Sequence, residues 1–204
     1  AQVGNGKFAF GMDITGLQTF VPFNTLSDWS WHSFPLPEGM RAEDYRPVVV
    51  ETHGKKIAYE LRNPDQPELS EWLTKNPHRY NLGRIGFRLL REDGTEAREI
   101  DLGNARQEID LWTGVVYSRF ELNRKEVKVR TVCHPDKDMI GVSIESELLN
   151  DGNMSIYLDF PYPDGRYFKH YIGRYDTISG HTSTFEKLAP NSVRITRTMD
   201  DTHY

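Results

Sequence analysis

The stretch GVVYSRFELNRKEVKVRTVC, residues 114–133, alternates apolar and polar side chains in two runs that meet at Asn123. Alternation with a period of two is typical of β-strands that bury one face. Asparagine supplies the positive φ angle that a tight hairpin loop requires. The stretch therefore predicts two antiparallel strands. Cys133 stands in phase with Val127 and Val129, so we expect it to be a small buried hydrophobic side chain.

The same alternation recurs along most of the chain. It is found in KFAFGMDI (7–14), KIAYEL (56–61), IGFRLL (85–90), MIGVSIES (139–146), MSIYLDF (154–160) and SVRITRTM (192–199). The apolar positions expected to share a buried face are Phe8, Phe10, Met12 and Ile14, then Ile57, Tyr59 and Leu61, then Ile85, Phe87 and Leu89, and last Val193, Ile195 and Met199. Asp93-Gly94 and Asn150-Asp151-Gly152 are typical turn sequences between such runs. The pattern predicts an all-β antiparallel fold, and at this length a sandwich is favoured over a small barrel.

One short helix is predicted in DQPELSEWLTKNP, residues 65–77. Pro67 suits an early helical position, and the apolar residues Leu69, Trp72 and Leu73 follow the i, i+3, i+4 spacing of a helix face. Asn76-Pro77 ends it, because the residue before a proline avoids helical backbone. We expect this helix to lie against the sandwich.

The segment 21–44 has a different character, with three prolines, four large aromatic residues and no sustained period. An irregular segment of this length inside a domain is uncommon and tends to be functional. Trp29 and Trp31 are two residues apart, so in extended backbone both would face one way and His32 the other. Indole rings stack on the apolar faces of sugars but also pack well in cores. Both interpretations, ligand contact and core or interface packing, stay open for these residues.

Composition argues against several function classes. The formal charge is −5, from 25 basic and 30 acidic residues, which argues against a nucleic-acid binder because phosphate neutralisation needs a basic surface. No apolar run approaches the roughly 20 residues that span a bilayer. Cys133 is the single cysteine, so neither an intrachain disulfide nor a multi-cysteine metal site is expected.

Catalytic signatures are also missing from the sequence. The histidines show no i, i+4 pair, and there is no Gly-x-Ser-x-Gly nucleophile motif. Gly4-Asn5-Gly6 lacks the length and the lysine of a phosphate-binding loop. A glycoside hydrolase needs two carboxylates across the scissile bond, and no such pair stands out. We expect no metal and no cofactor in this chain.

Three stretches together resemble a known family. They are VGNGKFAFGMDITGLQTF (3–20), SDWSWHSFPLPEG (27–39) and RQEIDLWTGVVYSRFELNRKEVKVRTVCHPDKDMIGVSIES (106–146). They resemble the N-terminal domain of bacterial six-hairpin glycosidases, which are related to maltose phosphorylases and to α-L-fucosidases with an (α/α)6 barrel. The likeness covers much of residues 3–146 and is looser beyond residue 150.

The resemblance implies a fold, a partner and a role. The fold would be a β-supersandwich of the galactose-mutarotase-like type, a single domain over residues 1–204. In such proteins a helical (α/α)6 barrel follows the sandwich and carries the catalytic residues. The chain would then be the non-catalytic N-terminal part of a glycoside hydrolase or phosphorylase whose barrel is absent here. Its loops would line the sugar site, with Asn5, Gln18, Trp29, Trp31 and His32 as candidate sugar-binding residues.

Two alternatives come from other function classes. The chain could be a free-standing carbohydrate-binding module that uses Trp29 and Trp31 as a stacking platform, or a mutarotase-like sugar epimerase with a convergent His and Glu. The three hypotheses predict different structural features. The glycosidase domain should have an apolar docking patch, the binding module an exposed indole pair, and the epimerase a closed pocket. The chain opens Ala-Gln with no basic and apolar lead-in, and we expect a periplasmic or extracellular bacterial protein after removal of a signal.

Overall fold

The computed structural model describes residues 1–59, 62–165, 172–177, 179–200 and 202–204. Strands account for 46% of the chain and helices for 9%, which confirms the predicted all-β, antiparallel class. The contacts divide the chain into two compact units. Unit 1 comprises Ala1–Ser30, Tyr80–Pro161 and Tyr171–Asp176, and unit 2 comprises Trp31–Arg79, Tyr162–His170 and Thr177–Tyr204. A single domain over residues 1–204 stays a prediction, and each unit is described by itself.

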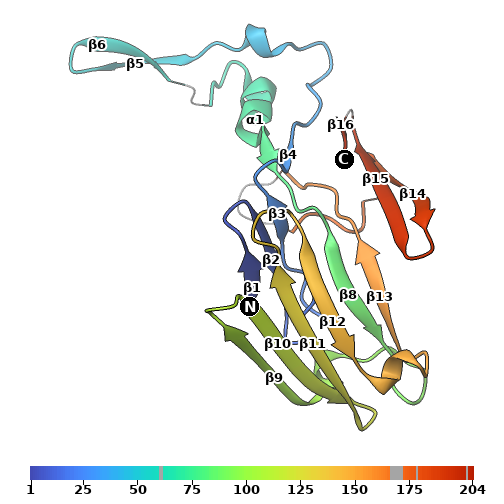
Figure 1. Ribbon diagram of the computed structural model, residues 1–204. Helices are drawn as coiled ribbons and strands as arrows, with labels where there is room; N and C mark the ends of the chain where they lie inside the picture. The colour runs from blue at the N-terminus through green and yellow to red at the C-terminus, as the bar shows by residue number, and fades with distance from the viewer. Residues whose placement is uncertain (60–61, 166–171, 178, 201) are drawn as a thin grey trace. The chain divides into compact units, whose positions relative to one another are not determined.

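Unit 1 holds three antiparallel sheets. One has the order β1-β2-β3 (Gln2–Gly4, Phe8–Gly11, Thr25–Ser27), the second pairs β13 (Met154–Asp159) with β8 (Arg84–Leu89), and the third has the order β12-β11-β10-β9 (Ile140–Glu145, Lys125–Cys133, Val115–Leu122, Gly103–Asp110). Two short 3-10 turns, η2 (Glu99–Asp101) and η3 (Glu147–Leu149), connect strands. Figure 1 shows β9 to β12 side by side as one twisted layer.

The hairpin of β10 and β11 forms as its sequence predicts. Phe120 pairs with Val127 across the hairpin, and the turn residues Asn123 and Arg124 have φ angles of 53° and 60°. The inward positions of this hairpin are buried, whereas Cys133 at its end is half-buried against the core. The alternation therefore gives both the strands and the face that they bury.

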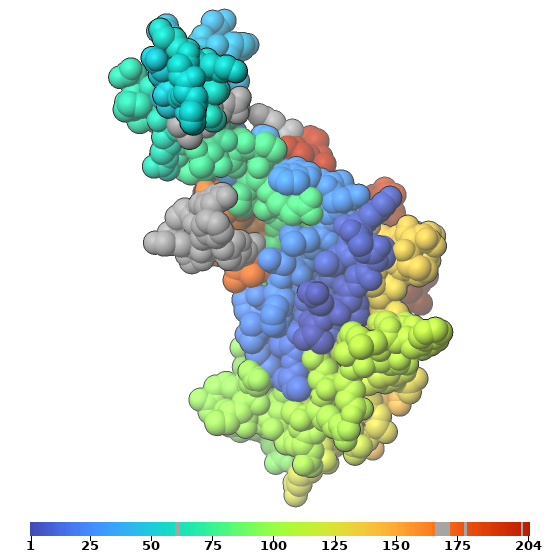
Figure 2. All heavy atoms as spheres, turned by 90° about the vertical axis from the view of Figure 1, so that its left-hand side faces the viewer, coloured from blue at the N-terminus to red at the C-terminus, as the bar shows by residue number. Residues whose placement is uncertain are grey.

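The core of unit 1 lies between two layers of strands. Buried side chains of β1, β2, β8 and β13 pack against those of β10 and β11, the set being Val3, Phe8, Phe10, Phe87, Leu89, Met154, Val116, Phe120, Leu122, Val127 and Val129. Figure 2 shows the N-terminal segment, in dark blue, against yellow-green residues of the four-stranded sheet, in agreement with the contacts of β1 with β10 and β11. This arrangement is sandwich-like, as predicted.

Unit 2 contains shorter sheets and the helix. Its elements are β4 (Trp31–His32), η1 (Ala42–Asp44), β5 (Val48–Thr52), β6 (Lys55–Tyr59), α1 (Pro67–Lys75), β7 (His78–Arg79), β14 (His181–Ala189), β15 (Ser192–Met199) and β16 (Thr202–His203). The pairs are β4-β7 and β5-β6, and β14-β15-β16 form a three-stranded sheet.

The helix α1 confirms the prediction from sequence. It begins at Pro67 and ends at Lys75, before Asn76. Leu69 is buried, and the Trp72 indole N–H donates to the Phe34 carbonyl over 2.8 Å. No helix among the described residues is long and apolar enough to cross a membrane.

Of two predicted buried faces of unit 2, the one in β6 is wrong and the one in β15 is confirmed only toward its end. In β6 the side chains of Ile57 and Tyr59 are 37% and 43% exposed, and Leu61 lies outside the described residues. In β15 Met199 is buried, but Val193 is 58% exposed. Arg197, which lies on the same face of the strand, is buried. Alternation predicts which side chains share a face, but it does not say whether that face meets a core.

Candidate functional site

Three loops of unit 1 are joined by hydrogen bonds near the predicted residue Asn5. The Asn5 side-chain amide donates to the carbonyls of His134 (3.0 Å) and Lys137 (3.1 Å). Its carbonyl oxygen accepts from the backbone N–H groups of Lys7 and Phe8. The Asp28 N–H donates to the Lys7 carbonyl over 2.8 Å. We call the segments 4–7, 27–30 and 134–138 the Trp29 loop cluster.

Trp29 is the exposed aromatic side chain of this cluster. Its indole N–H donates to Asp138 Oδ2 over 2.7 Å, and the same oxygen accepts from the Ser27 hydroxyl. The side chain is nevertheless 50% exposed. The hydrogen bond fixes the ring orientation while part of the ring surface still faces solvent. An aromatic ring held in one position can stack on a ligand with little further loss of side-chain entropy.

The backbone at Trp29 is not extended, so the condition under which the two tryptophans would face one way is not met. Trp29 lies in a turn that the Ser30 N–H closes onto the Ser27 carbonyl over 3.2 Å. Trp31 lies in the short strand β4 and belongs to unit 2.

Gln18 lies inside unit 1 and is fully buried. Its side-chain amide donates to the Gly11 carbonyl over 2.8 Å. Its backbone N–H donates to the Ile85 carbonyl, and its carbonyl accepts from the Tyr157 hydroxyl. These bonds join the 11–25 segment to β8 and β13. Gln18 supports the fold and presents no surface to a ligand.

Trp31 and His32 fall in unit 2 and have opposite exposures. Trp31 is 47% exposed, and the Arg79 guanidinium lies 4.5 Å from the centre of its ring. A cation over one face of an indole occupies the surface that a sugar would use. His32 is buried, and its Nε2 lies 2.8 Å from Asp200 Oδ2.

The His32–Asp200 pair is part of a buried polar cluster. The Tyr162 hydroxyl donates to the same Asp200 oxygen over 2.8 Å. Burial lowers the pKa of His32 more than Asp200 raises it. At neutral pH the ring is therefore neutral, and its Nε2–H donates a hydrogen bond to the carboxylate. Burial also raises the pKa of the Tyr162 hydroxyl. Asp200 has a φ of 48°, a strained value for a residue other than glycine. Because His32 is buried, this arrangement anchors β4 to the end of β15 rather than presenting a base to a substrate.

The described residues contain no group of three or more His, Cys, Asp or Glu side chains that could hold a metal ion. No protein-family model, curated protein or solved structure matches the chain.

The structure thus joins Asn5 and Trp29 through one loop, buries Gln18 inside unit 1 and assigns Trp31 and His32 to unit 2. Asp138, which binds Trp29 from the loop that Asn5 also contacts, was not among the residues predicted from the sequence. The sequence HPDKD (134–138) predicts a turn between two strands, and the structure confirms it between β11 and β12. The role of its last aspartate was not visible because its partner lies 109 residues away in the chain.

Proposed function

We propose that this chain is a non-catalytic, carbohydrate-binding domain of a carbohydrate-active protein, and that Trp29 contacts the sugar. The observation that carries the proposal is the half-exposed Trp29 indole, fixed by Asp138 in a cluster of cross-linked loops. A fixed indole offers a flat apolar surface that matches the C–H face of a pyranose ring. Its own N–H is used by Asp138, so recognition would come from stacking and from neighbouring polar groups of the cluster.

The roles of two well-protected carboxylates favour a non-catalytic domain. Asp13 accepts hydrogen bonds from Thr15, Phe20 and Val21 in its own loop. Asp200 accepts from His32 and Tyr162. A hydrolytic pair would have to face each other across a glycosidic bond, whereas both of these side chains hold local structure.

A catalytic partner domain remains part of the proposal. The hairpin between β9 and β10 ends in Leu111 and Trp112, whose side chains are 86% and 95% exposed. Asp110 orders this turn by accepting from the N–H of Trp112 and from the Thr113 hydroxyl. Exposed tryptophans on ordered turns are frequent anchors of protein interfaces. This tip supports docking of a further domain, which by resemblance would be an (α/α)6 barrel.

The two alternatives gain less support. Trp29 and Trp31 are both about half-exposed, as the binding module requires, but they belong to different units. The two-tryptophan platform loses weight because Arg79 covers a face of Trp31. An epimerase needs a histidine and a glutamate facing a cleft, whereas the described contacts of His32 are with Asp200, Phe34 and Tyr162.

The test is a panel of neutral and acidic oligosaccharides titrated into the wild-type chain and into Trp29→Ala. We expect at least one glycan to bind and Trp29→Ala to weaken it by roughly three- to tenfold. Trp31→Ala is the matched control, because it removes an indole of similar exposure, and it should leave the affinity unchanged. Equal affinity of Trp29→Ala and wild type would contradict the proposal.

A further inference from the structure

The outer face of the four-stranded sheet of unit 1 carries an unusual row of charges. The strand register places Arg119 of β10 directly opposite Arg106 of β9 and directly opposite Lys128 of β11. We call these three residues the cationic row. They lie on the face away from the core, because the alternating neighbours Ser118 and Val129 are buried.

This row is unfavourable for folding. Like charges directly opposite each other on neighbouring strands destabilise a sheet. Glu126 offsets part of the repulsion by contacting both Arg119 and Lys128, with a Lys128–Glu126 distance of 3.0 Å, and Glu108 contacts Arg106. On β12, Glu145 lies directly opposite Lys128 and contacts Arg130. Three carboxylates therefore contact four cations, the cationic row and Arg130. The requirements of the fold do not account for such an arrangement, since any polar residue would suit these outer positions.

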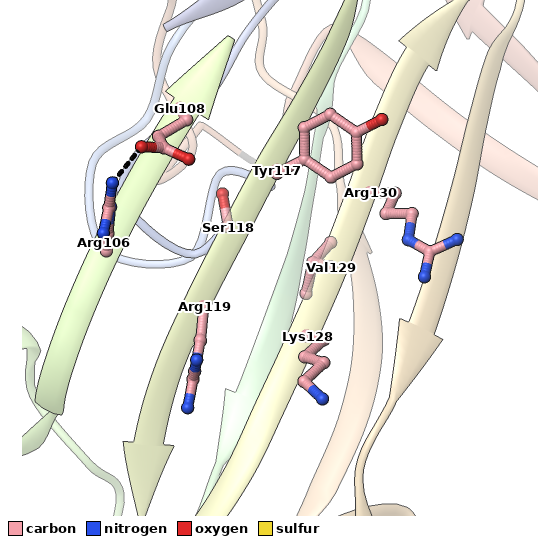
Figure 3. Close-up of a pocket in the computed structure, with 8 residues that line it drawn as sticks. All are labelled: Arg106, Glu108, Tyr117, Ser118, Arg119, Lys128, Val129 and Arg130. Carbon is pink, nitrogen blue, oxygen red and sulfur yellow. Dashed lines mark hydrogen bonds and ion pairs between the residues drawn. The ribbon is translucent and has the colours of Figure 1, made fainter. Parts of the chain in front are cut away.

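The row borders an open hollow of about 510 Å³. Next to the row, Tyr117 lies opposite Glu108 on β9 and Arg130 on β11. Tyr117 is 44% exposed. Figure 3 shows its ring at one end of the hollow and the side chains of Arg119 and Lys128 extending side by side at the other. An aromatic surface and several cations thus share one depression.

The cations retain donors for a ligand. A guanidinium carries five N–H donors, and the described contact of Arg119 with Glu126 uses only its Nε. The side chains of Arg106, Arg119 and Lys128 are 73%, 62% and 49% exposed. Arginine binds carboxylates with two parallel hydrogen bonds when both of its terminal groups can reach them. The hollow itself is lined by four cations, Arg106, Arg119, Lys128 and Arg130, and by one carboxylate, Glu108. This excess of positive charge is the complementarity expected of an anion site.

We propose that the cationic row and Tyr117 bind an oligosaccharide that contains uronic acid residues. One sugar ring stacks on Tyr117, and carboxylates of this ring or its neighbour pair with the row. Residues 117 and 119 are about 7 Å apart along the strand and the row spans about 10 Å across three strands, dimensions that suit consecutive sugar rings. The ligand class rests on the proposed function.

The experiment titrates a galacturonate trisaccharide and a neutral galactose trisaccharide into the wild-type chain by calorimetry. Arg119→Gln should weaken galacturonate binding by roughly tenfold, and Tyr117→Ala by about threefold. Wild-type affinity should fall as NaCl is raised, since exposed charges are screened. Arg194→Gln is the matched control. It removes an arginine of similar exposure that pairs with Glu186 on a neighbouring strand of unit 2, and it should bind as wild type does.

A urea midpoint for each variant separates binding from folding. Arg119→Gln should keep or raise the midpoint, because it relieves repulsion in the row. The proposal is overturned if Arg119→Gln binds galacturonate as the wild type does, if Arg119→Gln weakens the neutral trisaccharide as much as the galacturonate, or if single-stranded DNA competes for the row with higher affinity. Loss of galacturonate binding in Trp29→Ala but not in Tyr117→Ala would overturn this inference and leave the proposed function standing. Loss of galacturonate binding in Tyr117→Ala but not in Trp29→Ala would support the cationic row as the binding site and contradict the role of Trp29.

Discussion

At the scale of single residues, Asp13 explains the glycine-rich segment near the start of the chain. Its Oδ1 accepts from the N–H of Thr15 at 2.9 Å and from the Thr15 hydroxyl at 2.6 Å, and its Oδ2 accepts from the N–H groups of Phe20 and Val21. Gly16 in the same turn has a φ of 84°, and a Cβ there would come within 3.0 Å of Ser118 and Val129. A buried carboxylate and a glycine therefore shape this turn against β10 and β11.

Asp13→Ala should destabilise the chain because it leaves the donors of Thr15, Phe20 and Val21 without their acceptor. Buried unsatisfied donors cost about 1–3 kcal/mol each, so we expect a loss of at least about 2 kcal/mol in the free energy of unfolding, measured in urea. Asp13→Asn should lose less, because its amide oxygen can still accept. The control is Asp93→Ala, since Asp93 makes the same turn with Thr95 on an exposed surface. Equal losses in Asp13→Ala and Asp93→Ala would contradict this account.

At the scale of elements, the sequence predicts strands and helix more reliably than burial. The ends of α1 follow from Pro67 and from Asn76-Pro77, and the β10–β11 hairpin follows from its alternation around Asn123. The β5–β6 hairpin also forms, but its apolar side chains such as Ile57 are exposed. Alternation encodes two faces, and tertiary contacts decide which face is covered. The register of β10 with β11 could have been derived from the position of the turn, and with it the pairing of Arg119 with Lys128.

The β8–β13 pair contains a close contact that a glycine makes possible. The Tyr157 ring lies over Gly86 on the opposite strand, where a Cβ would meet the ring at 2.6 Å. The Tyr157 hydroxyl is bound to the Gln18 carbonyl, so the ring cannot easily move aside. Gly86→Ala should therefore lower the free energy of unfolding by about 1–3 kcal/mol.

Gly141→Ala is the matched control for this contact. Gly141 is also a strand glycine, and its Cβ would meet Val132 at 3.4 Å, an ordinary contact distance. We expect a change within about 0.5 kcal/mol in the same urea experiment. If Gly86→Ala is tolerated as well as Gly141→Ala, the Tyr157 ring is not held as described.

The link between β4 and β15 should depend on pH. Burial lowers the pKa of His32 and of His78 below 6.5, against the opposing effects of Asp200 and Asp164. Between the lowered folded pKa and 6.5 the unfolded chain binds more protons than the folded chain, so stability rises with pH. The contribution of these histidines is fully present above pH 6.5 and is lost as the pH falls through their folded pKa values.

Urea unfolding between pH 5 and 8 measures this dependence. His78→Gln should flatten the slope below pH 6.5, whereas His53→Gln, which changes an exposed histidine, should leave it as in the wild type. A wild-type stability that increases as the pH falls from 6.5 would refute the assignment.

At the scale of the whole chain, the candidate site depends on contacts that sequence reasoning could not anticipate. Asn5 meets the 134–138 loop over 129 residues of chain, and Trp29 meets Asp138 over 109. Which loops meet is decided by the order of strands in the sheets, not by local pattern. Sequence reasoning therefore proposed Asn5 and Trp29 on the same footing as Gln18 and His32, which the structure shows to be buried.

If the chain is a non-catalytic domain, it should not catalyse glycoside cleavage by itself. Incubation with a set of nitrophenyl glycosides should give no release of nitrophenol above the rate of a heat-denatured sample. Turnover by the purified chain would contradict the non-catalytic role.

The most direct test of the central claim is a two-dimensional NMR titration that follows the indole N–H signals. The Trp29 signal is identified from its absence in Trp29→Phe. With a neutral glycan that binds the chain, we predict that the Trp29 signal shifts in proportion to saturation while the signal of Trp112, which is 95% exposed on the β9–β10 turn, stays in place. A neutral glycan that binds and leaves the Trp29 signal unmoved would contradict the claim that Trp29 contacts the sugar.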